Sequence, residues 1–145
     1  ATDRRRPFAW STVSFPSERY VWFILKNPAQ LAVTLLWMSN GGRHYPPWNG
    51  RNINVMGIEE VTAFFHYGLA PSVAKNELSA AGIPTSVQLS PRRATTISTI
   101  MGCVSTPRGF GRVKKITMGR DRMTAILTGE GNAVETPLDW SWLAT

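Results

Sequence analysis

The sequence is poor in the residues that build disulfides and metal centres. Its 145 residues contain one cysteine, Cys103, and two histidines, His44 and His66. One cysteine excludes a disulfide framework and a cysteine-based zinc site, and a zinc site built from both histidines would need a third ligand. Cys103 lies in the apolar run TISTIMGCV, so we expect a buried, unreactive thiol. We expect no metal ion and no other cofactor.

Long apolar runs are also missing. YVWFILK and LAVTLLWM are shorter than the roughly 18 residues that a membrane helix requires, and polar or turn-forming residues follow each run. The basic segment ATDRRRPFAW has no apolar stretch behind it, so we expect no secretory signal in it. No membrane partner is expected. The redox compartment stays open, and the single cysteine favours a reducing, cytoplasmic one.

Positive charge exceeds negative charge, with 16 Lys and Arg against 9 Asp and Glu, a formal net charge of +7. A basic chain invites nucleic-acid binding. The cations nevertheless fall in small clusters at a terminus or beside turns, and no nucleic-acid-binding motif is recognisable. We interpret them as a solvated surface, or as a preference for anionic ligands, and rank nucleic acid lower. The clusters are Arg4 to Arg6, Arg92 with Arg93, Lys114 with Lys115, and Arg120 with Arg122.

Apolar and β-branched runs at roughly ten-residue spacing predict an all-β fold, an antiparallel sandwich or barrel. Residues 1–17 are interpreted as a basic N-terminal arm and residues 18–145 as a single β-sandwich domain. RYVWFILKN and LAVTLLWMS predict an antiparallel hairpin. Further strands are predicted for INVMGIEE, TSVQLS, ATTISTIMGCV, GFGRVKKITMG, DRMTAILTG and NAVETPLDWSWL. APSVAKNELSAAG, from Pro71 to its stop at Gly82, predicts one short peripheral helix.

The segment NGGRHYPPWNGRN cannot be regular structure, because glycines and prolines interrupt it, and loops this long are often functional. Aromatic rings form a platform for the apolar face of a sugar, while guanidinium and amide groups bond its hydroxyls. A plain loop, with its tryptophan in the core and its arginines solvated, is the alternative. The predicted substrate-binding residues are Asn40, Arg43, Tyr45, Trp48, Arg51 and Asn52.

Glu59 and Glu60 end the run INVMGIEE, and on a strand their side chains face opposite sides. Gly57 leaves room for a ligand on the face of Glu59, so we predict that Glu59 points inward as a functional carboxylate. A salt bridge from Glu59 to a loop arginine is the alternative. His44 is preferred over His66 as a second catalytic residue, because it lies in the loop and imidazole titrates near neutral pH.

Two longer segments, GRHYPPWNGRNINVMGIEEVTAFF and then GIPTSVQLSPRRATTISTIMGCVSTP, resemble the C-terminal half of galactose-mutarotase-like proteins, the aldose 1-epimerase relatives. The resemblance covers roughly residues 20–105. It implies a β-supersandwich that binds a hexose-like sugar on a concave sheet, with Glu59 as the base at the anomeric hydroxyl. The acid histidine of that family belongs to the preceding half, and His44 lies in a different motif. The resemblance therefore implies self-association, or pairing with a missing N-terminal half.

Three functions stay open at this point. The first is an aldose-1-epimerase-like enzyme that acts on a monosaccharide or sugar phosphate, with Glu59 as general base. The second is a non-catalytic sugar-binding module that keeps the same concave site. The third, ranked lowest, is a basic interaction protein for nucleic acid or for an assembly.

Overall fold

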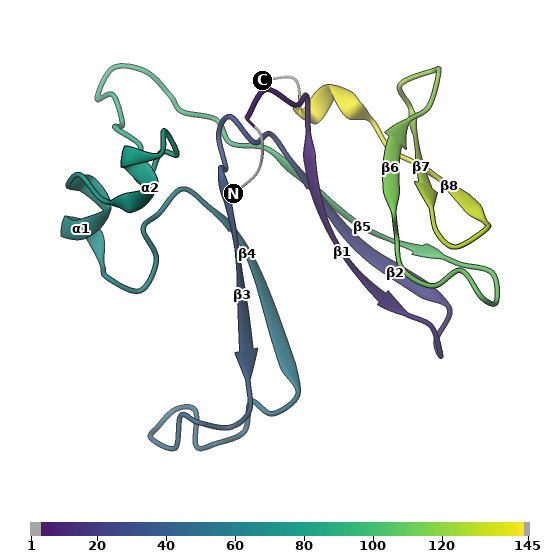
Figure 1. Ribbon diagram of the computed structural model, residues 1–145, viewed down its shortest axis with the longest axis horizontal. Helices are drawn as coiled ribbons and strands as arrows, with labels where there is room; N and C mark the ends of the chain where they lie inside the picture. The colour runs from purple at the N-terminus through teal and green to yellow at the C-terminus, as the bar shows by residue number, and fades with distance from the viewer. Residues whose placement is uncertain (1–3, 144–145) are drawn as a thin grey trace. The chain divides into compact units, whose positions relative to one another are not determined.

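The computed structural model describes residues 4–143, in which the regular secondary structure is mainly β-strand (Figure 1). All paired strands are antiparallel, which confirms the all-β class. The strands are β1 (Ala9–Phe15), β2 (Tyr20–Lys26), β3 (Val33–Ser39), β4 (Val55–Val61), β5 (Thr99–Ser105), β6 (Lys115–Met118), β7 (Thr124–Thr128) and β8 (Ala133–Pro137). The helices are α1 (Leu69–Val73), α2 (Glu77–Ala80) and the 3-10 helix η1 (Trp140–Leu143). None of the helices in this part of the chain is long and apolar enough to cross a membrane.

The described residues group into two compact units. Residues 4–30 and 90–143 form what we call the two-sheet unit, with the sheets β1-β2-β5 and β6-β7-β8. Residues 31–89 form the hairpin unit, with the sheet β3-β4 and both α-helices. The stretch predicted as a single domain, residues 18–145, therefore contributes to both units.

The N-terminal arm predicted over residues 1–17 contains a strand. β1 pairs with β2 along its whole length, from Ala9 opposite Lys26 to Phe15 opposite Tyr20. The prediction of a loosely held arm is therefore wrong for Ala9–Phe15. β2 is a central strand, and its backbone N–H and C=O groups need hydrogen-bond partners on both edges. β1 supplies these partners on one of the two edges.

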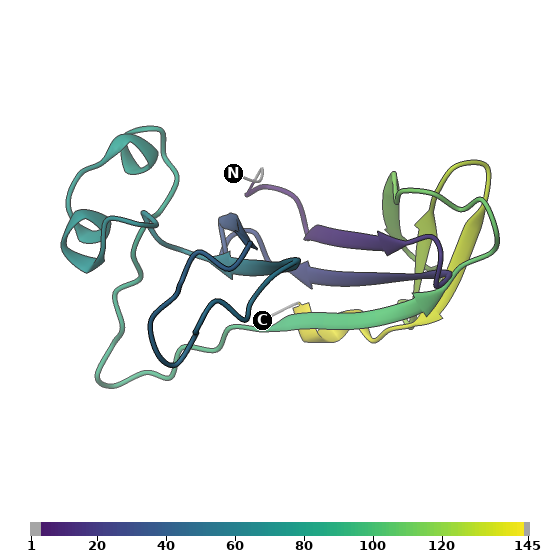
Figure 2. The ribbon, with the colours of Figure 1, turned by 90° about the horizontal axis from the view of Figure 1, so that it is seen from below.

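β2 is the central strand of its sheet (Figure 2). Successive side chains of a strand face opposite sides, so Val21, Phe23 and Leu25 share one face, and all three are buried. The predicted hairpin of RYVWFILKN with LAVTLLWMS is wrong, because β2 pairs with β1 and β5 whereas β3 pairs with β4. The Asn-Pro turn between the two runs carries the chain into the hairpin unit instead.

The two sheets of the two-sheet unit share one apolar core. The cluster consists of Val21, Phe23, Leu25, Phe110, Val113, Ile116, Ala125, Leu127, Leu138, Trp140 and Leu143. Trp140 closes one end, and its indole Nε1–H donates to the Thr124 carbonyl oxygen at 2.6 Å. Truncating a fully buried leucine in such a cluster typically costs about 2–5 kcal/mol, so this unit has the means to fold stably.

The hairpin unit has a different internal organisation. The predicted helix over residues 70–82 is split into α1 and α2, and the predicted strand TSVQLS has no strand partner in the described structure. α1 ends at Val73, with Ala74 as its C-cap, and Asn76 is the N-cap of α2. The Asn76 side chain accepts from Ser79 N at 2.9 Å while Ser79 Oγ accepts from Asn76 N at 2.8 Å. This reciprocal capping box satisfies two backbone donors and stops one continuous helix from forming.

Apolar burial is distributed unevenly between the units. Among the described residues of the hairpin unit, the buried hydrophobic residues are Leu31 and Ala32, at its start. The same unit contributes twelve of the sixteen exposed large hydrophobic residues within residues 4–143. Apolar burial is the main driving force of folding, so the hairpin unit has little of the burial that stabilises the two-sheet unit.

Candidate functional site

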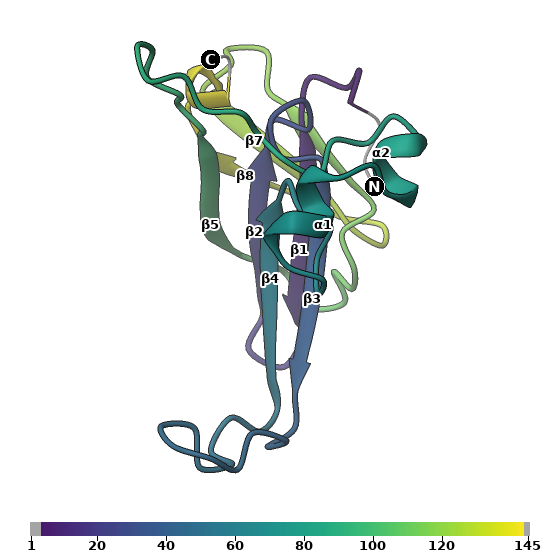
Figure 3. The ribbon, with the colours of Figure 1, turned by 90° about the vertical axis from the view of Figure 1, so that its left-hand side faces the viewer.

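The loop predicted as a ligand site joins β3 to β4 at the end of their hairpin (Figure 3). It is irregular, as predicted, but well hydrogen-bonded. Gly41 N donates to Asn52 O at 2.9 Å, and Gly50 N donates to Arg43 O at 2.8 Å. Ser39 Oγ also donates to Asn52 O, at 2.6 Å. These bonds continue the hairpin beyond the strands and hold the loop in one arrangement.

Gly41 and Gly50 permit this close approach. Gly41 has φ of 76°, and a Cβ on it would lie 3.1 Å from Gly50 O. Gly50 has φ of 67°, and a Cβ there would lie 3.3 Å from His44 Nδ1. A side chain at either position would be strained in this left-handed backbone region and crowded by the opposite arm of the loop.

Arg43 lies between two tryptophans of the same unit. Its guanidinium carbon is 5.2 Å from the ring centroids of both Trp37 and Trp48. Such contacts are worth about 0.5–1 kcal/mol each at exposed sites, so the stack stiffens the hairpin end. Arg43 thus covers part of the Trp48 ring that was predicted to receive a sugar.

Gly57 does not leave the open space that we expected. It lies opposite Trp37 in the β3-β4 register, and a Cβ on Gly57 would stand 3.3 Å from Trp37 Cε3. The space above this glycine is filled by the indole of Trp37, since an aromatic side chain on one strand often packs over a glycine on its neighbour. Cross-strand pairing places Trp37 over Gly57, and the alternation of residues along a single strand does not reveal that pairing.

Glu59 and Glu60 do face opposite sides, but their environments are the reverse of those predicted. Glu59, opposite Leu35, is exposed. Glu60 is half-buried and accepts a hydrogen bond from Thr34 Oγ1 at 2.7 Å. The inward orientation predicted for Glu59 is therefore wrong: the Trp37 indole covers Gly57 on this face, but the side chain of Glu59 stays exposed. The catalytic role of Glu59 stays a prediction, and its carboxylate is not buried.

The remaining predicted residues all lie in the loop, within fifteen positions of one another. The side chains of Asn40, Arg43, His44, Tyr45 and Arg51 are exposed, whereas Trp48 and Asn52 are half-buried. The main-chain carbonyl oxygen of Asn52 accepts the two hydrogen bonds from Gly41 N and Ser39 Oγ described above, so Asn52 helps to hold the loop. No group of three or more His, Cys, Asp or Glu side chains within residues 4–143 is placed to hold a metal ion. Cys103, expected to be buried, is exposed on β5.

The hairpin presents an apolar face that was not expected from the sequence. In the β3-β4 register Leu36 is opposite Ile58 and Met38 is opposite Met56. These four side chains lie on the same face, and we call them the apolar hairpin face. Leu36 is 62% exposed, Met38 74% and Met56 44%. The signal was present as apolar residues at every second position of both strands.

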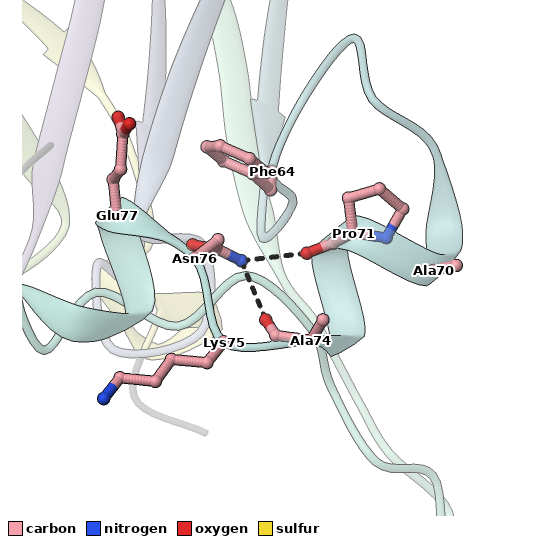
Figure 4. A pocket seen from close by; sticks show the side chains of 7 residues that line it. All are labelled: Phe64, Ala70, Pro71, Ala74, Lys75, Asn76 and Glu77. Atoms are coloured by element: carbon pink, nitrogen blue, oxygen red, sulfur yellow. Dashed lines mark hydrogen bonds between the residues drawn. The ribbon is translucent and has the colours of Figure 1, made fainter.

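A second feature missed from the sequence is a pocket of about 580 Å³ beside the two helices (Figure 4). The amide of Asn76 projects toward the carbonyl oxygens of Pro71 and Ala74, each 3.1 Å from Nδ2, while Lys75 and Glu77 extend away from it. The same Nδ2 lies 2.8 Å from Thr85 Oγ1. The Asn76 amide is therefore satisfied by the fold, and the other lining residues besides Lys75 and Glu77 have apolar side chains.

An adjoining pocket of about 530 Å³ shares Phe64 with the first. Beneath it Ser72 is buried, accepts from Phe64 N at 3.1 Å and donates to Gly68 O at 2.8 Å. Thr85, also buried, donates to Ser72 O at 2.7 Å. Residues 62–87 are thus held together largely by side-chain to backbone hydrogen bonds.

Neither a protein-family model, a curated protein nor a solved structure matches the chain. The resemblance to galactose-mutarotase-like proteins therefore stays an expectation from short motifs.

Proposed function

We propose that this chain is an assembly protein that associates with further copies of itself through the apolar hairpin face. The observation that carries the proposal is the contrast between three exposed apolar side chains on one face, Leu36, Met38 and Met56, and the near absence of buried apolar residues in the described part of the same unit. Exposed apolar patches of this kind mark interaction surfaces.

Sheet geometry supports the same proposal. β3 and β4 form a two-stranded sheet, and neither has a second strand partner among the described residues. An isolated two-stranded hairpin is marginally stable in water, and its outer edges present unpaired N–H and C=O groups. Association would cover the apolar face and extend the stabilising contacts of the hairpin.

Charge favours a second copy as the occupant. Residues 31–89 contain three Lys or Arg and three Asp or Glu, so this unit brings no net repulsion to a contact with itself. The four side chains of the apolar hairpin face are uncharged. Glu60 adjoins them at one end of the same face, where it accepts a hydrogen bond from Thr34, and Glu59 lies on the opposite face. A patch with no charge is complementary to itself, and packing of two such patches about a twofold axis is the commonest form of self-association.

Two matched variants test the proposal. Met56 and Val55 are neighbours on β4, are each 44% exposed and lie on opposite faces. We expect the wild-type chain to show concentration-dependent mass in light scattering, Met56→Ser to weaken this self-association by roughly tenfold or more, and Val55→Ser to leave it nearly unchanged. A wild-type chain that stays monomeric, or equal effects of both variants, would contradict the assembly role.

A sugar-binding role at the end of the hairpin is the second candidate. Exposed Tyr45 and Arg51 beside the Arg43 and Trp48 stack favour it, because a ring and a guanidinium are suited to bind a sugar face and its hydroxyls. The finer fold assignment, a galactose-mutarotase-like supersandwich, and an epimerase activity with Glu59 and His44 belong to this candidate.

Monosaccharides and sugar phosphates titrated against tryptophan fluorescence, beside a mutarotation assay, test the sugar-binding candidate. Turnover that Glu59→Gln abolishes supports the enzyme, and saturable binding without turnover supports the module. Binding that Tyr45→Ala leaves unchanged would place the sugar elsewhere. The absence of any binding would leave assembly as the proposed function.

A further inference from the structure

The net positive charge is concentrated in the two-sheet unit. Residues 4–30 and 90–143 contain thirteen Lys and Arg against five Asp and Glu, a formal net charge of +8, whereas residues 31–89 contain three of each sign. Twelve of the thirteen cations are exposed, the buried one being Lys26. Charge asymmetry of this size between parts of a chain favours a polyanionic partner for the basic part.

Six of the thirteen cations of the two-sheet unit fall in one segment of the chain. Residues 108–122 contain six Lys and Arg and one acid, Asp121. β6 lies in the middle of this segment, at the end of the sheet order β6-β7-β8, and its outer edge has no strand partner among the described residues. Ile116 points into the core, so Lys115 faces away from it. We call this the basic β6 edge: Arg108, Arg112, Lys114, Lys115, Arg120 and Arg122, all exposed.

The nearby acids leave this charge largely uncompensated. Asp121 accepts from Met123 N at 2.9 Å and from Thr124 Oγ1 at 3.1 Å, so its carboxylate is bonded within its own turn. Glu130 lies 3.9 Å from Lys114 Nζ, and both side chains are more than half exposed. An exposed ion pair of this kind is weak and screened by salt, so it competes poorly with a phosphate.

An exposed aromatic side chain belongs to the short helix that contacts the β6–β7 turn. Trp142 is 64% exposed and belongs to η1. That helix is tied to the β6–β7 turn, since Trp140 N donates to Arg122 O at 3.3 Å and Leu138 N donates to Met123 O at 2.9 Å. Trp142 therefore lies two residues after Trp140, which contacts Arg122 in the β6–β7 turn.

From this juxtaposition we infer that the basic β6 edge binds single-stranded nucleic acid. Its cations, on β6 and in the loops before and after it, contact phosphates of the nucleic acid, and Trp142 stacks on a base. A row of cations beside an exposed aromatic ring is the combination that sequence-tolerant single-strand binding uses. The inference goes beyond self-association, because it involves the other unit. It also reverses the low rank given to nucleic acid from the sequence, where these clusters were counted separately.

The test measures binding of the full chain to a labelled oligothymidylate by fluorescence anisotropy over a range of salt concentrations. We expect log K to fall linearly with log salt. Lys114→Ser with Lys115→Ser should lower the slope by about 1.4, the value for two phosphate contacts on a single strand. Trp142→Ala should weaken binding at least about fivefold with the slope unchanged, and Trp142→Phe should restore most of it.

Two control variants distinguish binding at the β6 edge from a general effect of positive charge and from self-association. Arg92→Ser with Arg93→Ser removes the same charge from the same unit outside the edge and should have a smaller effect. Met56→Ser, which disrupts assembly, should keep the affinity of each chain for the oligonucleotide, so the two proposals fail independently.

Three results would overturn the inference: absence of binding at low salt, equal loss of affinity in both double variants, or tighter binding to phosphatidylserine-containing vesicles than to the oligonucleotide. Absence of binding at low salt would indicate that the cations instead prevent the edge of β6 from pairing with a strand of another molecule.

Discussion

The ring of Phe23 on β2 lies across Gly102 on β5. The two residues are opposite each other in the antiparallel register, and a Cβ on Gly102 would stand 2.8 Å from Phe23 Cζ. The glycine leaves a gap on the sheet surface, and the aromatic ring fills it. This contact joins two strands that are almost eighty residues apart in the sequence.

Gly102→Ala should destabilise the two-sheet unit. The added methyl forces Phe23 from its position in the core, and overpacking of this kind costs about 1–3 kcal/mol of the free energy of unfolding. Urea denaturation measures the change. Gly42→Ala is the control, because its Cβ would meet nothing within 4 Å. Equal stability of the two variants would contradict the packing described for Phe23.

Arg43→Lys should loosen the end of the hairpin without unfolding the chain. Lysine keeps the charge but loses the planar group that stacks between Trp37 and Trp48. We expect faster amide exchange at Gly50, whose N–H donates to the Arg43 carbonyl oxygen. Arg51→Lys, which alters an exposed arginine of the same loop, should leave that exchange rate close to wild type.

Asn76→Ala should destabilise residues 62–87 more than Lys75→Ala does. The substitution removes the α2 cap and the contact with Thr85, and loss of such a cap typically costs about 1 kcal/mol. Hydrogen exchange by mass spectrometry should show the increase in this segment. If protection there is unchanged, the polar network does not hold the segment together.

The Asp121 turn should loosen in acid. The backbone hydrogen bond from Met123 is the largest cause that holds the pKa of Asp121 below its ordinary value of 3.8, and the side-chain bond from Thr124 adds to it. A lowered folded-state pKa gives stabilisation that is present above pH 3.8 and is lost as the pH falls through the folded value. A carboxyl titration followed by NMR should place Asp121 below 3.8, and Asp121→Asn should remove this pH dependence of the turn.

The candidate site was foreseen in part. The loop after β3 was expected to be irregular and to bring aromatic and basic side chains together, and Arg43 with Trp48 does so. Its glycines and prolines made this visible, since they exclude helix and strand whatever the rest of the chain does. Glu59 was misplaced for a different reason. Alternation along a strand says which residues share a face, but not which face is covered.

Strand pairing was also out of reach. β2 and β3 follow each other along the chain, yet each pairs elsewhere, β2 with β1 and β5 and β3 with β4. Antiparallel neighbours are chosen by cross-strand packing and by the core, both of which involve distant segments. The exposed position of Cys103 follows from this pairing, because it lies on β5 opposite Trp22.

The sequence by itself determined the all-β class, the irregular loop, the period of two along each strand and the excess of positive charge. These depend on composition and on runs of a few neighbouring residues. Only the tertiary structure decided that Trp37 fills the space over Gly57, that Leu36 and Met56 stay uncovered, and that β6 lies at the end of its sheet. Burial and strand order depend on which distant segments pack together, and a local pattern carries little information about that choice.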